Sequence, residues 1–291
     1  MTAEEILREN VEFLRRVRLQ DLSTRIVLEA LDKAEEMYRY EITGETAAAL
    51  HILDFEDTLD LLLERPKSFS RFGDGELAII AGKSTPFQEY RRDLAERLKE
   101  ILRELQDACY VGLDHRYFAP PKNFTRDAKI SVRMNGKFWR ETILAHCNRK
   151  RLYITSAFSC GHTAFDGNYS AYMEKTRELF RDRELIIFSG RTVFDRIEHD
   201  VFEYAASRQH VFADSKNAWS QYGEIMTLAR QFPKNFTLCF ILGQAATVLA
   251  YDLAQEGYMA WDIGHLAKEY DACRKAAAGS TTSFDNFFAP D

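Results

Sequence analysis

The chain has 291 residues, of which 46% are hydrophobic and 29% charged, and its formal net charge is −6 at pH 7. These values are typical of a globular protein with one large α/β domain, or of one domain with a helical appendage. They exclude the strongly basic surface that nucleic-acid binding requires, so we expect no nucleic-acid partner.

The cysteines and the apolar stretches bear on the cellular compartment of the protein. Five cysteines are scattered along the chain without a Cys-x-x-Cys pair, which argues against a zinc ribbon and against a disulfide framework. The first residues are charged and lack the apolar core of a signal peptide. The longest apolar stretch, residues 236–254, is interrupted by Gly243, Gln244 and Asp252, so no membrane span is expected. These features predict a cytoplasmic protein.

Residues 1–65 contain no proline and a single glycine, and they carry 16 acids and 8 bases. Pro66, the first proline of the chain, marks the expected boundary. The segment predicts a helical N-terminal extension over residues 1–65, through which the protein could form a homo-oligomer. The alternative is that its helices cover the core. Apolar residues recur at helical spacing in three groups: Leu7, Val11 and Leu14; Val27, Leu31, Ala34 and Tyr38; and Ile52, Phe55, Leu59 and Leu62.

From residue 66 onward, short apolar segments typical of strands alternate with segments of helical periodicity. This alternation predicts an α/β domain over residues 66–275, with a mainly parallel sheet covered by helices on both faces, and a C-terminal tail over residues 276–291. Ligands of such folds bind at the carboxyl ends of the strands. The expected strands are 68–72, 109–113, 152–156, 185–189, 210–213, 237–242 and 259–263, and the expected helices are 87–105, 137–147, 169–180, 193–207, 218–230 and 245–255.

The first motif at such a strand end is Gly73-Asp74-Gly75-Glu76, which follows the expected strand 68–72. Glycines on both sides of Asp74 permit turn conformations that are closed to other residues. Two carboxylates separated by one flexible residue can bind a single hard cation, Mg²⁺ or Mn²⁺, that also binds substrate phosphates. The motif therefore favours a nucleotide-dependent transferase with Asp74 and Glu76 as metal ligands. The alternative is that both acids cap a helix that begins nearby.

The same Asp-x-Glu spacing occurs twice more in the chain. Asp54 and Glu56 fall in an expected helix, where side chains two residues apart point about 200° away from each other and cannot share an ion. Asp182 and Glu184 lie in an expected solvated turn before a strand. Only the copy at Asp74 has glycines around it and a strand before it.

A second strand end carries Ser215-Lys216-Asn217, just before an expected helix. Ser215 or Asn217 can cap that helix, whose free amide groups and dipole favour an anion. Lys216 adds a positive charge that suits phosphate. The segment predicts a nucleotide-binding site, and a plain helix cap with a solvated lysine is the alternative.

A third strand end carries Gly243-Gln244, followed by small residues and Thr247 at the start of a helix. Gly243 allows a ligand to approach the backbone closely, and the hydroxyl of Thr247 can contact it. The spacing matches neither the dinucleotide fingerprint nor a Walker loop, which argues against a nicotinamide dehydrogenase. Tight packing of the helix on the sheet is the alternative to ligand contact.

A fourth strand end carries Asp262, Gly264 and His265. Asp262 can bind sugar or ribose hydroxyls, and Gly264 permits a turn. His265 and Glu269 share one helix face at positions i and i+4. A histidine can act as a base or a phosphate donor near neutral pH, although a structural role is the alternative.

Together these segments resemble the GT-D glycosyltransferase family, a former domain of unknown function from bacterial glycosylation clusters. The resemblance runs from about Ser68 to Tyr270 and leaves residues 1–65 outside. It rests on an ordered set of motifs: Arg71 to Glu76, Val111-Gly112-Leu113, Phe138-Trp139, Ser215 to Ala218, Gly243 with Ala246 to Leu253, and Asp262 to His265.

The resemblance implies a Rossmann-like fold and a metal-dependent transferase. It implies a divalent cation, Mn²⁺ or Mg²⁺, at Asp74 and Glu76, a UDP-sugar donor, typically UDP-glucose, and a sugar acceptor on a glycoprotein or glycan. Arg71, Gly73 and Gly75 then belong to the nucleotide site.

In the implied reaction, the cation, Arg71 and Lys216 stabilise the charge on the departing UDP while an acceptor hydroxyl attacks the anomeric carbon. The expected base is His265, Glu269 or Asp262.

The sequence also departs from the family at three places: Gly243-Gln244-Ala245 stands where Gly-Pro-Thr is usual, residues 189–200 replace a glutamate-rich stretch, and Ala267-Lys268 replaces acids. The alternative function is therefore a non-catalytic nucleotide-sugar or glycan-binding subunit that scaffolds a partner transferase. A metal-dependent phosphohydrolase is a third hypothesis, for which the aspartyl nucleophile motif is lacking.

Overall fold

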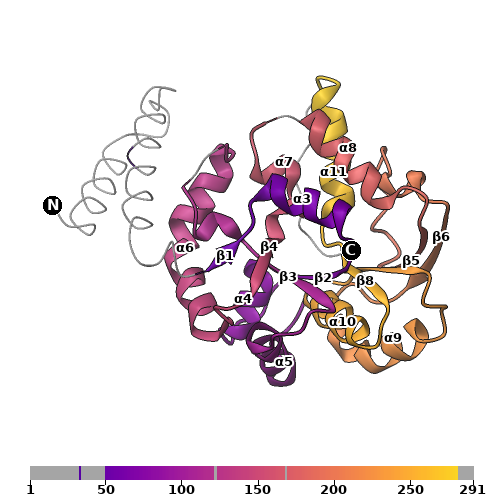
Figure 1. Cartoon of the computed structure of the whole chain (residues 1–291), viewed down its shortest axis with the longest axis horizontal. Coiled ribbons are helices and arrows are strands. Elements are labelled where there is room, and N and C mark those ends of the chain that lie inside the picture. The colour runs from indigo at the N-terminus through magenta and orange to yellow at the C-terminus, as the bar shows by residue number, and fades with distance from the viewer. Residues whose placement is uncertain (1–32, 34–49, 121–122, 168, 281–291) are drawn as a thin grey trace.

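The computed structural model describes Lys33 and residues 50–120, 123–167 and 169–280 of the chain. Its centre is one eight-stranded sheet in the order β1-β4-β3-β2-β8-β7-β5-β6, and all neighbouring strands are parallel (Figure 1). The predicted parallel α/β architecture is therefore confirmed. The strands are β1 (His51–Ile52), β2 (Ser68–Phe72), β3 (Cys109–Leu113), β4 (Leu152–Thr155), β5 (Glu184–Ser189), β6 (Ser207–Phe212), β7 (Thr237–Ile241) and β8 (Met259–Asp262).

The predicted strands agree closely with the observed ones. The expected segments 68–72 and 109–113 coincide with β2 and β3, and the other five differ by one to three residues at an end. The agreement has a physical reason, because strands buried on both faces read as short continuous apolar runs. In β7, for example, the first four of five residues are buried.

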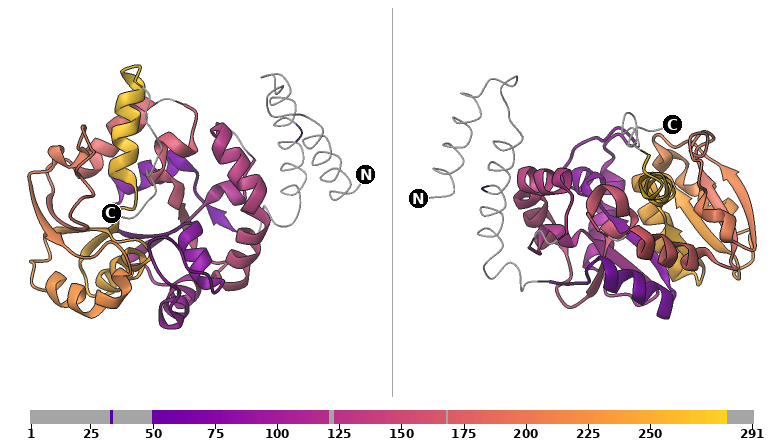
Figure 2. Two further views of the ribbon diagram at one scale, coloured as in Figure 1. Left: turned by 180° about the vertical axis from the view of Figure 1, so that it is seen from behind. Right: turned by 90° about the horizontal axis from the view of Figure 1, so that it is seen from above.

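Helices cover both faces of the sheet (Figures 1 and 2). One apolar layer joins α4, α5, α9 and α10 to the sheet, and the other joins α3, α8 and α11 to it. The α-helices are α3 (Phe55–Glu64), α4 (Asp74–Ile80), α5 (Arg92–Arg103), α6 (Arg126–His146), α7 (Gly161–Ala164), α8 (Tyr169–Phe180), α9 (Tyr222–Ala229), α10 (Gln244–Gln255) and α11 (Leu266–Ala277). Short 3₁₀ helices are η2 (His115–Tyr117), η3 (Ser156–Ser159), η4 (Val201–Tyr204) and η5 (Ala218–Gln221).

The residues just before Pro66 belong to the α/β core. β1 pairs with β4 and extends the sheet by one strand. Leu59 and Leu62 of α3 are buried in the same apolar cluster as Phe69 of β2. Residues 50–65 were expected in a separate extension, so here the alternative, a core-covering helix, is the one observed. Ile52 was expected in that helix and lies in a strand instead, because Asp54 caps α3 by accepting a hydrogen bond from the Asp57 amide. Residues 1–32 and 34–49 lie outside the described residues.

Three helix predictions need correction. The segment 193–207 holds only the short η4, since the amides of Glu198 and His199 donate to Asp271 of α11 and fix an irregular chain. The segment 87–91 is a loop, and α5 begins at Arg92. The helix expected at 137–147 begins eleven residues earlier, where the Thr125 hydroxyl caps α6.

The strand order reverses at the centre of the sheet, and we call the region outside the strand ends at this switch point the crevice. From β2 the chain moves to β3 and β4 on one side, whereas β8, β7, β5 and β6 lie on the other side. In open parallel sheets, ligands bind outside the carboxyl ends of the strands where the order reverses in this way. That point lies between β2 and β8, and α4 begins directly after β2. No helix of the described residues is both long and apolar enough to cross a membrane.

Candidate functional site

Arg71 of β2 and Asp262 of β8 form a buried ion pair at the switch point. The Nη2 atom of Arg71 lies 3.0 Å from Oδ1 of Asp262, and its Nε donates to the Asp262 carbonyl at 2.8 Å. The remaining nitrogen, Nη1, donates to the Ser159 hydroxyl at 2.6 Å. Burial lowers the pKa of Arg71, but attraction to Asp262 outweighs burial and raises it. All three guanidinium nitrogens are thus engaged with the protein.

Two residues complete this arrangement. The Thr247 hydroxyl at the start of α10 donates toward the Arg71 carbonyl (3.0 Å) and Oδ2 of Asp262 (3.1 Å). Gly264 has φ of +53°, and a Cβ there would lie 1.7 Å from Nη2 of Arg71. The predicted ligand-binding residues Arg71, Thr247, Asp262 and Gly264 are therefore brought together, and they hold one another.

Asp74 and Glu76 both lie in the first turn of α4 rather than in an open turn. Glu76 turns back, and its Oε2 accepts a hydrogen bond of 2.7 Å from the Gly73 amide. Asp74 is exposed. Helical side chains two residues apart point in different directions, so the helix itself does not aim the two carboxylates at one point. The capping alternative is observed for Glu76.

Glu76 carries a perturbed carboxyl group. Burial, followed by the negative charge of Asp262, raises the pKa of Glu76 to about 7, against the effects of the Gly73 amide and Arg71. The negative charge that raises the pKa of Glu76 is therefore that of Asp262, at the end of the neighbouring strand β8. A raised pKa in a strand-end crevice is a mark of functional sites.

A divalent cation fits this region only with help from a substrate. Within the described residues no three side chains of the His, Cys, Asp and Glu types gather to hold a metal. Mg²⁺ and Mn²⁺ commonly use one or two carboxylates and take further oxygens from substrate phosphates and water. Glu76 and Asp74 supply such carboxylates at the correct end of β2, and a cation beside Glu76 would relieve the repulsion from Asp262.

A loop between α4 and α5 covers the start of α10. A Cβ on Gly243, whose φ is +53°, would lie 3.1 Å from Cβ of Phe87. Gln244 is buried, accepts from the Thr85 hydroxyl at 3.2 Å, and fills the space over Gly75, where a Cβ would meet its amide nitrogen at 2.2 Å. The expected close approach of a ligand to Gly243 is thus replaced by contact with Phe87.

Asn217 holds the other end of this loop. It adopts the left-handed conformation with φ of 56°, and its Oδ1 accepts from the Glu89 amide at 2.7 Å. Its own amide donates to the Phe87 carbonyl at 2.7 Å. Its side chain makes no capping hydrogen bond to η5, so Asn217 is not the predicted cap and instead positions the loop.

Ser215 and Lys216 line an open cavity of about 500 Å³ at the ends of β5 and β6. Arg191, from the loop after β5, lies over the ring of Phe212 at 5.0 Å. Arg191 and Lys216 bring two positive charges to this cavity, and Asp214 is hydrogen-bonded to Gln221. The cavity is lined by Gly190, Arg191, Thr192, Phe212, Ala213, Asp214, Ser215, Lys216 and Gln221.

His265 lies close to the switch point. Its ring centroid is 5.9 Å from that of Phe87. Burial, together with the positive charges of Lys268 and Arg71, lowers the pKa of His265 to about 3. The imidazole therefore stays neutral in the physiological range and can donate or accept a hydrogen bond, but it is a weak base there.

Glu269 is fully buried and holds the start of α7. Its Oε2 accepts from the amides of His162 and Thr163 at 2.9 Å each, and its Oε1 accepts from the Thr163 hydroxyl at 2.5 Å. Burial raises the pKa of Glu269 to about 7 despite these hydrogen bonds. The contacts make Glu269 a positioning residue, which differs from the base predicted for it.

The structure adds an ion pair that was not predicted from the sequence. Asp114 directly follows β3, and Arg116 binds its carboxylate in a bidentate manner, with Nε 2.9 Å from Oδ1 and Nη2 2.6 Å from Oδ2. Burial opposes ionisation, but the charge of Arg116 holds the pKa of Asp114 below its usual range. The signal was available, because Asp114 ends an expected strand just as Asp262 does.

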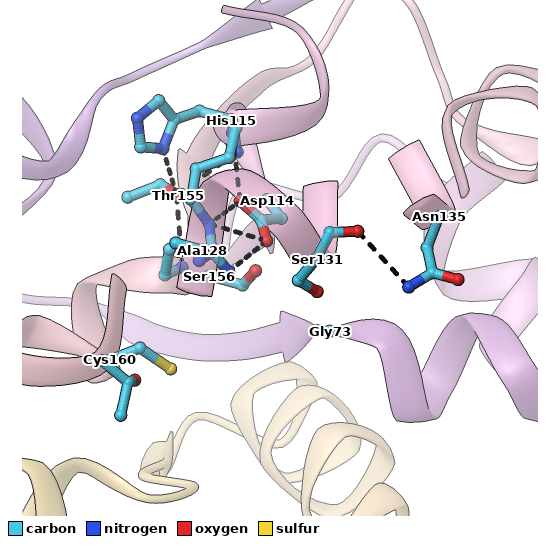
Figure 3. Close-up of polar contacts among 12 residues, drawn as sticks. Gly73, Asp114, His115, Ala128, Ser131, Asn135, Thr155, Ser156 and Cys160 are labelled. Carbon is cyan, nitrogen blue, oxygen red and sulfur yellow. Dashed lines mark hydrogen bonds and ion pairs between the residues drawn. The ribbon is translucent and has the colours of Figure 1, made fainter. Parts of the chain in front are cut away.

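Figure 3 shows further polar groups beside these strand ends. Asp114 follows β3, Ser156 and Cys160 follow β4, and Ser131 and Asn135 belong to α6. Helix α6 packs against α4, the helix that begins directly after β2.

Known proteins share this sequence and fold. A family model for the GT-D glycosyltransferase fold matches residues 69–283. A probable glycosyl transferase Gly of Streptococcus gordonii is 33% identical over 232 residues, which is 76% of this chain and 33% of that protein. The glycosyltransferase GlyD of Streptococcus pneumoniae serotype 4 is 27% identical over 238 residues, 78% of this chain and 28% of that protein. The chain spans about a third of the length of these curated relatives.

Solved structures agree. A selenomethionine structure of domain of unknown function 1792 has a TM-score of 0.74 and 29% identity and covers 83% of this chain and 86% of that chain. A second, described as having a distinct glycosyltransferase fold, has a TM-score of 0.72 and 30% identity, with coverages of 81% and 84%. A third, described as a new glycosyltransferase from Streptococcus sanguinis, has a TM-score of 0.73 and 29% identity, with coverages of 82% and 92%. On its matched residues, its sheet and its strand-end motifs, this chain belongs to the GT-D glycosyltransferase family.

Proposed function

We propose that the protein transfers a hexose, with glucose as the expected sugar, from a UDP-sugar to a glycan or glycoprotein acceptor. The observation that carries this proposal is Glu76, a carboxylate with a pKa of about 7 that lies at the switch point beside the Arg71–Asp262 pair. Family membership supports a transfer reaction, since the relatives are described as glycosyltransferases.

A divalent cation, Mg²⁺ or Mn²⁺, is part of the proposal. Glu76 would bind it together with phosphate oxygens of the donor, and Asp74, which points in a different direction from the same helical turn, would reach it through a bridging water. When bound, it would supply Lewis-acid stabilisation of the charge on the departing UDP. The protonated form of Glu76 is a poor cation ligand, so cation binding is expected to strengthen as the pH rises through about 7.

Positive charge is present at strand ends on both sides of the switch point. Arg116 is fixed by Asp114 at the end of β3, and Lys216 and Arg191 line the cavity at the ends of β5 and β6. Fixed cations that need no rearrangement stabilise a departing diphosphate efficiently. Arg71 contributes by orienting Asp262, since its own nitrogens are occupied.

The test is release of UDP from a panel of nucleotide sugars in the presence of Mn²⁺. We expect Glu76→Gln to lower the release rate by about 100-fold or more, because a residue that acts on the leaving group contributes several kcal/mol in the transition state. Asp74→Asn is expected to cost less, because Asp74 is exposed.

The control variant is Glu178→Gln, an exposed acid of α8 that pairs with Arg181, the residue directly after the helix. It should leave the rate unchanged. A wild-type rate in Glu76→Gln, or the absence of both binding and release across the whole panel, would contradict the proposal.

A second function, a non-catalytic nucleotide-sugar or glycan-binding subunit, is favoured by one observation. The start of α10, where close approach of a ligand to the backbone was expected, is covered by Phe87 and Gln244. Calorimetry separates the two functions, because the subunit would bind UDP without releasing it from any donor.

A further inference from the structure

The outer face of α6 carries an unusual row of exposed apolar side chains. Ile130 is 37% exposed, Met134 77% and Phe138 42%. They are spaced four residues apart, so they lie side by side along the helix. Single exposed apolar residues are common on protein surfaces, whereas a contiguous row marks an interaction surface. We call Ile130, Met134 and Phe138 the α6 row.

The α6 row is separate from the crevice. The core side of α6 buries residues such as Val132, Gly136 and Ile143. Ser131 and Asn135, which share a hydrogen bond from the Asn135 amide to the Ser131 carbonyl, follow the row by one position and so lie on a different side of the helix (Figure 3). The α6 row therefore serves neither the core nor the polar groups at the strand ends.

Basic residues flank the α6 row. Lys129, Arg133 and Lys137 repeat at the same spacing one position earlier in the sequence. Lys83, from the turn after α4, lies over the ring of Phe138 at 4.6 Å. The surface therefore suits a partner with apolar side chains at helical spacing and an excess of acids.

Residues 1–49 of the same chain have this character. They contain 11 acids and 7 bases, a net charge of −4, and two groups of apolar residues at helical spacing, Leu7 to Leu14 and Val27 to Tyr38. The continuous described segment starts at Leu50, which packs against the same apolar cluster as Trp139 and Leu144 of α6. The segment thus joins the domain beside the helix that carries the α6 row.

We propose that residues 1–49 bind the α6 row of their own chain through their apolar positions. The short connection at Leu50 makes this binding intramolecular, which raises the effective concentration of the segment at α6. The bound segment would brace α6, which packs against α4, the helix that begins directly after β2.

The experiment uses the full chain and measures amide hydrogen exchange by mass spectrometry. In the wild type, peptides within residues 1–49 should exchange more slowly than an unprotected chain. In the double variant Met134→Asp, Phe138→Asp, their exchange should accelerate by about tenfold or more, because two apolar contacts are lost. Both side chains are exposed, so the α/β domain should keep its exchange pattern and circular dichroism.

Leu228→Asp is the matched control, since Leu228 of α9 is also 42% exposed but lies far from α6 in the fold (Figure 1). It should leave the exchange of residues 1–49 unchanged. Three results would overturn the proposal. The first is equal exchange of residues 1–49 in the wild type and the double variant. The second is protection that depends on protein concentration and comes with a doubled mass, which indicates binding to a second copy, and the third is protection that arises only with phosphatidylglycerol vesicles, which indicates binding to a membrane surface.

Discussion

The side chains at the carboxyl ends of β2 and β8 have two different roles. Some bind one another and hold the strand ends in place, whereas others are available to a ligand. Arg71 binds both Asp262 and Ser159, which fixes the ends of β2 and β8 relative to η3. Glu76, by contrast, uses Oε2 for the Gly73 amide and has a pKa of about 7. An acid whose pKa is raised by burial, and which lies beside a fixed ion pair, can respond to a cation without rearrangement of the backbone.

Gly264 is a residue whose replacement should destabilise the fold. Gly264→Ala combines an unfavourable positive φ with a Cβ 1.7 Å from Arg71, which must then leave Asp262. We expect a loss of about 2–5 kcal/mol in the free energy of unfolding, measured by urea denaturation. Gly279→Ala is the control, because Gly279 has φ of +78° and open space around it, so only the backbone cost of about 1 kcal/mol applies. Equal losses in the two variants would rule out the contact with Arg71.

The pKa of Glu76 predicts a pH dependence of stability. The folded-state pKa of about 7 lies above the ordinary glutamate value of 4.5, so the folded protein binds the proton more tightly than the unfolded chain. Ionisation of Glu76 therefore lowers stability as the pH rises from about 4.5 to about 7. The difference in unfolding free energy between Glu76→Gln and wild type should increase across this window and level off above it. A difference that is constant with pH would show that Glu76 ionises normally.

At the scale of elements, the loop between α4 and α5 decides which helix starts are open. Phe87 lies over Gly243 at the start of α10, and Asn217 binds the Glu89 amide. The loop was expected to be helical from residue 87 because its apolar residues fit helical spacing. Hydrogen bonds from Asn217 and packing on Gly243 outweigh that local preference, and they depend on residues more than 120 positions away.

Helix α6 depends on its cap. The Thr125 hydroxyl accepts from the Ala128 amide at 3.1 Å and donates to the Thr163 carbonyl at 2.6 Å, which ties α6 to α7. Thr125→Ala should lower the free energy of unfolding by about 0.5–2 kcal/mol in urea denaturation. Thr142→Ala is the comparison within α6, where the hydroxyl bonds its own helix at Phe138, and it should change stability by less than about 0.5 kcal/mol. If the two losses are equal, the cap is not what fixes α6.

At the scale of the whole molecule, the site spreads along one edge of the sheet. β2 and β5 are separated by β8 and β7, and neighbouring strands lie about 4.8 Å apart, so Glu76 and the cavity beside Arg191 are roughly 14 Å apart. A ligand that uses both must be extended and must pass the ends of β8 and β7. Phe87, His265 and Gln244 line this path near the switch point.

The sequence by itself determined the strands, the parallel sheet and the positions of the strand-end motifs. Buried strands are short apolar runs and helices have their own period, so these features are local and can be recognised without coordinates. The family motifs identified the same strand ends, and the comparisons confirm the family. Asp114 could have been found by the same rule that identified Asp262.

Only the tertiary structure decided which of these polar groups are bound or covered by other parts of the chain. Arg71 is bound by Asp262, Glu269 by the start of α7, and Gly243 is covered by Phe87, each through a partner distant in sequence. It also showed that α3 belongs to the core, because burial of Leu59 depends on β2 and not on its own helix. The physical reason is that a motif fixes the chemical type of a side chain, whereas the packing of distant segments fixes its partner, its burial and therefore its pKa.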